Sequence, residues 1–136
     1  MSWKLSRTVL RGGTGGNAGS LLDQRTARGK QPFYIRRRDG LPMWFAGISD
    51  RWEGRGQSLA TCAIVTTESN DALRPIHDRM PVILFEDAWD QWLDRAVRDT
   101  RQLLDLLRPC PAARIATRAV GTRVNSPKND DAALIE

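Results

Sequence analysis

One short loop combines the residue types best suited to proton transfer and anion binding. His77, Asp78 and Arg79 are consecutive, His77 is the one histidine of the chain, and Pro75 and Pro81 flank the triplet. Proline fixes its own φ and disfavours a helical conformation in the residue before it, so this connection is stiff. An imidazole exchanges protons near neutral pH. We therefore identify His77 as the candidate acid–base residue.

The same loop also has a structural interpretation, because a single histidine often serves only as a hydrogen-bonding group. The net charge of +5 comes from an arginine excess, and arginine suits bidentate phosphate contacts. Many basic proteins bind no nucleic acid, however. Charge alone therefore leaves a polyanion-binding surface and an ordinary solvated surface equally open.

Length and composition indicate one globular domain. The chain has 136 residues, of which 27% are charged and 40% hydrophobic. It contains no apolar run long enough to span a membrane, and its first residues lack the apolar stretch of a signal peptide. We expect a cytoplasmic monomer without a membrane partner.

The two cysteines suggest neither a metal site nor a disulfide framework. Cys62 lies in an apolar run typical of a strand, which predicts a buried core thiol. Cys110 stands between two prolines, and the sequence assigns it no task. We expect no cofactor, no metal and no cysteine nucleophile.

The elements around the loop are predicted to be mainly strands. Ordered structure is expected to begin at Lys30, after a flexible glycine-rich linker over residues 11–20. Residues 31–38 and 41–48 flank Asp-Gly, a pattern that predicts a β-hairpin. Arginines 36–38 fit either the charged end of an edge strand or a phosphate contact.

Further along, residues 60–67 predict a central strand and residues 81–84 a buried one. Apolar residues then recur at helical spacing from Phe85, in either one helix or two with a restart at Asp99. Their Trp and Leu stripe is interpreted as core packing. Residues 114–124 predict two short terminal strands.

With these elements assigned, the chain resembles the SOS-response-associated peptidase family, also called the abasic-site-processing or SRAP domain. The resemblance runs from Lys30 to the C-terminus. Its most specific motif is His-Asp-Arg-Met-Pro at positions 77–81. The other matching segments are residues 30–35, 43–48, 52, 61–67, 70, 76–84, 92–93, 118–125 and 134–136.

The resemblance implies an α+β fold with a mixed, β-barrel-like core and flanking helices. It implies single-stranded DNA with abasic sites as the partner. In the family, an N-terminal cysteine attacks the sugar aldehyde and forms a covalent DNA–protein crosslink. By motif position, His77 assists this chemistry, Arg79 holds DNA phosphate and Thr66 lines the lesion pocket.

The chain departs from the family pattern at its N-terminus. It begins Met-Ser-Trp-Lys instead of Met-Cys-Gly-Arg, and residues 20–24 stand in place of the family's Gly-Phe-Tyr-Glu-Trp segment with its catalytic glutamate. We therefore expect an N-terminally truncated domain, with a non-homologous segment over residues 1–24 and a partial SRAP domain over residues 25–136.

Three functional hypotheses follow. The first is that the chain processes abasic sites as its family does. The second is that it binds DNA but lacks the covalent chemistry. The third is an inert fragment with exposed strand edges. The Ser2 amine could form a Schiff base with an aldehyde, but a hydroxyl closes the second ring bond poorly compared with a thiolate. The sequence therefore leaves open whether the chain is an enzyme.

Overall fold

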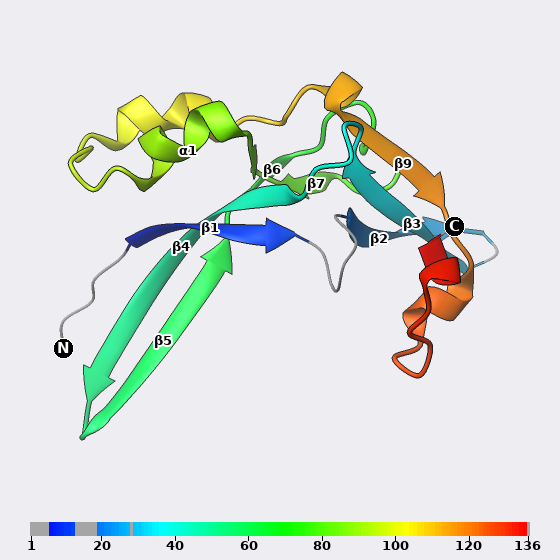
Figure 1. The fold of residues 1–136 in the computed structure, drawn as a ribbon, viewed down its shortest axis with the longest axis horizontal. Coiled ribbons are helices and arrows are strands. Elements are labelled where there is room, and N and C mark those ends of the chain that lie inside the picture. The colour runs from blue at the N-terminus through cyan, green and yellow to red at the C-terminus, as the bar shows by residue number, and fades with distance from the viewer. Residues whose placement is uncertain (1–5, 13–18, 28, 136) are drawn as a thin grey trace.

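The computed structural model describes residues 6–12, 19–27 and 29–135, and Figure 1 shows their arrangement. The strands are β1 (Ser6–Gly12), β2 (Gly19–Thr26), β3 (Gly29–Arg37), β4 (Met43–Gly54), β5 (Gln57–Ile64), β6 (Thr66–Glu68), β7 (Arg79–Pro81), β8 (Ile83–Leu84) and β9 (Ile115–Ala119). The helical elements are α1 (Glu86–Leu93) and the short 3-10 segments η1 (Thr100–Leu106), η2 (Ala112–Arg114), η3 (Thr122–Asn125) and η4 (Ala132–Ile135).

The described strands form three antiparallel groups. One sheet has the order β1-β4-β5, with β8 also paired to β4, a second has the order β2-β3-β9, and β6 pairs with β7. The α+β class is confirmed. The described strands do not close into a barrel, so the β-barrel-like core expected from the resemblance is replaced by separate sheets.

The predicted hairpin across Asp39-Gly40 is wrong. The turn itself forms, with Gly40 at φ 78° and its N–H donating to Arg37 O at 3.2 Å. β3 nevertheless pairs with β2 and β9, whereas β4 pairs with β1, β5 and β8. Both edges of β3 are therefore occupied, and the chain turns out of one sheet into the other.

Ordered structure begins earlier than the sequence predicts, because β1 and β2 precede Lys30. β1 pairs with β4 from Ser6↔Ser49 to Gly12↔Met43, and β2 pairs with β3 along eight residues. Residues 13–18 of the predicted glycine-rich linker lie outside the described part of the chain.

The predicted central strand over residues 60–67 is also wrong. Its first part belongs to β5, whose eight residues are all exposed, and its last part forms the short strand β6. β5 pairs with β4 in a long hairpin, the β4–β5 arm, which projects from the rest of the fold (Figure 1). Cys62 is therefore exposed instead of buried in the core.

Helical structure from Phe85 onward forms two main segments, which resolves the alternative that the sequence left open. Asp99 caps η1 by accepting a hydrogen bond from Arg101 N at 3.0 Å. Within the Trp and Leu stripe, Trp92 and Leu103 are buried as predicted, whereas Leu93 and Leu104 are exposed. No helix in the described part of the chain has the length and apolar character needed to cross a membrane.

The C-terminal region contains one strand where two were predicted. β9 pairs with β3, and the chain then forms η3. Two clusters of buried side chains fill the fold. The first is Ile35, Met43, Phe45, Leu73, Ile76, Met80, Ile83, Phe85, Cys110 and Ile115. The second packs beside α1 and η1 and contains Ala46, Val82, Leu84, Trp92 and Leu103.

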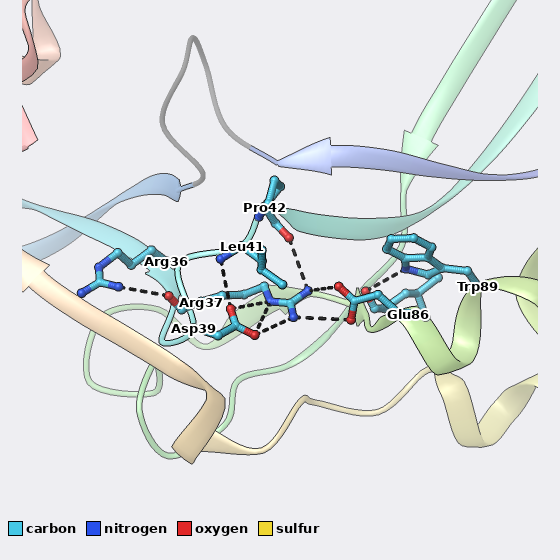
Figure 2. A network of polar contacts seen from close by, with 8 residues as sticks. Arg36, Arg37, Asp39, Leu41, Pro42, Glu86 and Trp89 are labelled. Atoms are coloured by element: carbon cyan, nitrogen blue, oxygen red, sulfur yellow. Dashed lines mark hydrogen bonds and ion pairs between the residues drawn. The ribbon is translucent and has the colours of Figure 1, made fainter.

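Arg37 is a buried cation that joins the turn after β3 to the first turn of α1 (Figure 2). Its guanidinium lies 2.6 Å from Asp39 Oδ2 and 2.9 Å from Glu86 Oε1, and it stacks 4.8 Å from the Phe85 ring centroid. These hydrogen bonds lower the pKa of both carboxyl groups. Because β3 is the middle strand of its sheet, the edge-strand interpretation of the arginines is wrong.

Arg38 also has a structural role, since it donates to the backbone oxygens of Ala113 and Ile115. Arg36 is exposed and donates to Arg37 O at 3.2 Å. The three consecutive arginines therefore differ in role. Arg37 forms buried ion pairs, Arg38 donates hydrogen bonds to the backbone, and Arg36 faces solvent.

Candidate functional site

The paired strands β6 and β7 bring together two of the residues selected from sequence. Thr66 pairs with Pro81, and Glu68 pairs with Arg79. Across this ladder, Arg79 Nη2 donates to Thr66 O at 2.8 Å and to Thr66 Oγ1 at 3.0 Å. Because one nitrogen makes both contacts, Nε and Nη1 of the exposed guanidinium remain for a ligand.

His77 lies directly before this strand pair and is held by its neighbours. Arg79 N donates to His77 Nδ1 at 3.0 Å, and Arg79 O and Asp78 Oδ1 each lie 3.1 Å from the same ring nitrogen. When Nδ1 accepts from Arg79 N, the neutral ring carries its proton on Nε2. When the ring is protonated, Nδ1–H can instead donate to Arg79 O or to Asp78. Both protonation states are therefore accommodated.

The loop before His77 is braced from inside the molecule. Asn70 Nδ2 donates to Cys110 O at 2.9 Å, and Asn70 Oδ1 accepts from Leu73 N at 3.1 Å. His77 N donates to Leu73 O at 2.9 Å, and Leu73 itself is buried. Asn70 thus fixes the turn that presents His77. The sequence contained a signal for this role, because asparagine favours such capped turns.

A pocket of about 510 Å³ opens between the His77 loop and the second sheet. Gln24 Nε2 donates to Pro75 O at 2.6 Å and ties the two walls together. Lys30 Nζ lies 3.7 Å from Asp23 Oδ2 within this pocket. The lining residues are Asp23, Gln24, Arg25, Lys30, Pro75, Ile76, His77 and Asp78.

The structure therefore places His77 in a pocket, with Arg79 and Thr66 beside it on the β6–β7 ladder and outside the lining. Sequence reasoning missed the wall formed by Asp23, Arg25 and Lys30. The predicted boundary after residue 24 falls inside β2. Only the pairing of β2 with β3, with Arg25 opposite Lys30, brings these residues to the loop, and no local sequence pattern signals it.

Neither cysteine contributes to the pocket. Cys110 is buried, and burial raises the pKa of its thiol to about 11. Cys62 is exposed on the β4–β5 arm. Within the described residues, no group of three or more His, Cys, Asp or Glu side chains is arranged to hold a metal ion.

Comparisons with known proteins identify the family. The profile of the SOS response associated peptidase (SRAP) family matches residues 23–127. Abasic site processing protein YoaM of Bacillus subtilis is 39% identical over 116 residues, which are 85% of this chain and 50% of YoaM. YedK of Escherichia coli, also named an abasic site processing protein, is 32% identical over 79% of this chain and 49% of its own length. The chain spans about half the length of such relatives.

Solved structures support the fold. A protein from Bacteroides thetaiotaomicron superimposes with a TM-score of 0.82 at 23% identity, covering 96% of this chain and 56% of the other. A protein from Bordetella bronchiseptica gives a TM-score of 0.71 at 24% identity, covering 85% and 55%. The described arrangement of strands and helices is therefore one that experimentally solved proteins also adopt.

Proposed function

The chain belongs to the SOS response associated peptidase family, and from this premise we propose that it binds DNA at abasic sites and holds the lesion against the His77 loop. The observation that carries the proposal is the placement of His77 in a pocket of about 510 Å³. Nδ1 of the ring is engaged by the backbone of Arg79, and Nε2 has no hydrogen-bond partner among the described residues. A proton donor or acceptor is thus presented to a bound sugar.

In this proposal, Arg79 binds a phosphate beside the lesion. Its contact with Thr66 fixes the direction of the guanidinium and leaves other N–H groups for the phosphate oxygens. The pocket lining carries two cations, Arg25 and Lys30, and two carboxylates, Asp23 and Asp78, so the phosphate contact is assigned to Arg79 beside the pocket. We favour single-stranded DNA, because a flexible strand can turn one sugar inward at little cost.

A second candidate function is retention of abasic DNA without covalent chemistry. The positions of the cysteines favour it, since one thiol is buried and the other lies on the arm. A buried thiol with a raised pKa is a poor nucleophile. The two candidates share a binding surface and differ only in whether a bond to DNA forms.

The test combines two gels. The purified chain is incubated with a single-stranded oligonucleotide that carries one abasic site, and with the same oligonucleotide intact. A shift in a native gel that prefers the abasic strand supports the proposed function, and a band that survives a denaturing gel adds covalent chemistry. Equal or absent shifts with both strands would contradict the proposal.

A further inference from the structure

We propose that the amine of Lys30 forms a Schiff base with the aldehyde of a ring-opened abasic sugar in the His77 pocket. This inference rests on the proposed function, because abasic DNA supplies the aldehyde. It concerns a residue that sequence reasoning assigned no chemistry. The position of Lys30 is set by the β2–β3 pairing, which puts it opposite Arg25 at the pocket.

The composition of the pocket singles out this amine. Of the two lysines that the structure describes, Lys30 and Lys128, Lys30 lines the pocket with His77. Its side chain is 63% exposed, so an aldehyde can reach Nζ from solvent. The neighbouring Arg25 cannot substitute, because a guanidinium stays protonated and does not act as an amine nucleophile.

The groups needed for the reaction lie around the same pocket. The Asp23 carboxylate, 3.7 Å from Nζ, can stabilise a positively charged imine. His77 presents Nε2 and can supply a proton to the carbonyl oxygen. A lysine amine, an imidazole and a carboxylate are the components that imine formation requires.

The reaction balances without a further reagent. The neutral Lys30 nitrogen attacks C1′ of the aldehyde, a C–N bond forms, and the carbonyl oxygen takes up a proton to give a carbinolamine. A second proton on that oxygen lets it leave as water, and the nitrogen lone pair completes the C=N bond. The proton lost by the amine is the first one delivered to oxygen, and protonated His77 supplies the second; the product is the protonated imine, and loss of its N–H proton returns that proton to His77. Water reverses every step.

Trapping with sodium cyanoborohydride tests the proposal, because reduction converts the imine into a stable secondary amine. Wild type, Lys30→Arg and the matched control Lys128→Arg are incubated with the abasic oligonucleotide and the reductant, then resolved on a denaturing gel. We expect Lys30→Arg to lose about tenfold or more of the trapped product, since arginine keeps the charge but not the nucleophile. Lys128→Arg should match wild type.

Two further readouts separate this proposal from the proposed function. Fluorescence anisotropy measures the affinity of wild type and of Lys30→Arg for abasic DNA, so that the trapped yield is compared at equal occupancy of the protein. Peptide mass mapping should find the modified residue at Lys30. An oligonucleotide with a tetrahydrofuran abasic analogue, which has no aldehyde, should give no trapped band.

The outcomes are distinct. Binding of abasic DNA without any trapped product would overturn the Schiff base and leave the proposed function standing. Trapping that persists in Lys30→Arg, that maps to the N-terminal amine, or that occurs with the tetrahydrofuran strand would also overturn it. Absence of binding by wild type would overturn both proposals together.

Discussion

The His77 loop and the β4–β5 arm are stabilised in opposite ways. The loop is tied to distant segments by Asn70, which reaches Cys110, and by Gln24, which reaches Pro75. Strand β5 is fully exposed and its described pairing is to β4 alone. Exposed backbone ladders open at low free-energy cost, whereas braced loops need wider unfolding. We therefore expect the candidate site to open less readily than the arm.

Cysteine alkylation gives the largest expected contrast between the two regions. At pH 8 a thiol with a pKa of about 11 is only about 0.1% thiolate, and Cys110 is also buried. Cys62 is exposed on the arm. We expect iodoacetamide to modify Cys62 at least about 100-fold faster than Cys110, as followed by peptide mass spectrometry. Comparable rates would mean that the site region opens as readily as the arm.

Matched leucine truncations should show the same contrast in stability. Leu73 is 2% exposed beneath the His77 loop, and Leu59 is 57% exposed on the arm. Leu73→Ala should lower the free energy of unfolding by about 2–5 kcal/mol, because it leaves a cavity. Leu59→Ala should change it by less than about 0.5 kcal/mol. Urea unfolding followed by tryptophan fluorescence measures both, and similar losses would refute the comparison.

The Arg37 ion-pair centre predicts a smaller, pH-dependent effect. Arg37→Ala should lower the free energy of unfolding by about 2 kcal/mol at pH 7. This is less than for a fully buried ion pair, because both carboxylates are half exposed. The control Arg36→Ala, at an exposed position, should lower it by less than about 0.5 kcal/mol. Folding lowers the pKa of Asp39 and Glu86, so their contribution is present above their unfolded pKa values and is lost as the pH falls below about 4. The difference between wild type and Arg37→Ala should therefore shrink in acid. A constant difference down to pH 3 would show that packing alone is responsible.

Substitutions at the candidate site should separate DNA binding from covalent processing. Their effects on DNA affinity are the smallest that we predict. Arg79→Ala should weaken retention of every DNA sequence several-fold and reduce the salt slope by about one, because one phosphate contact is lost. His77→Ala should abolish any covalent processing and leave retention nearly unchanged. Anisotropy titrations across salt concentrations, with trapping gels beside them, measure both. Equal loss of both activities in His77→Ala would assign the histidine a purely structural role.

Sequence patterns predicted the features that depend on neighbouring residues, such as helix starts and turns. The helical region from Phe85 follows from apolar residues at helical spacing, and the second helical segment begins after Asp99, where the sequence allowed a restart. Strand partners depend on distant segments, and here the predictions failed. The Asp39-Gly40 turn formed without its hairpin, and the apolar run with Cys62 became an exposed edge strand.

The candidate site shows the same division. His77, Arg79 and Thr66 were selected from motif positions, and the structure places them on one strand pair and the loop before it. The opposite wall of the pocket could not be predicted, because Lys30 reaches it only through sheet pairing. Arg37 likewise gave no sign of burial, since its partners are set by the packing of α1 against the turn.

The hydrogen bond from Gln24 to Pro75 joins residues 51 positions apart and links the two walls of the pocket. A binding surface that is assembled from such distant segments exists only in the folded chain, so a ligand that binds it shifts the folding equilibrium by mass action. At a free concentration 100 times its dissociation constant, such a ligand adds about 2.7 kcal/mol to the unfolding free energy. Damaged DNA would then act as a thermal stabiliser of this chain, and a melting-temperature screen of oligonucleotides would rank its ligands without any enzymatic assay.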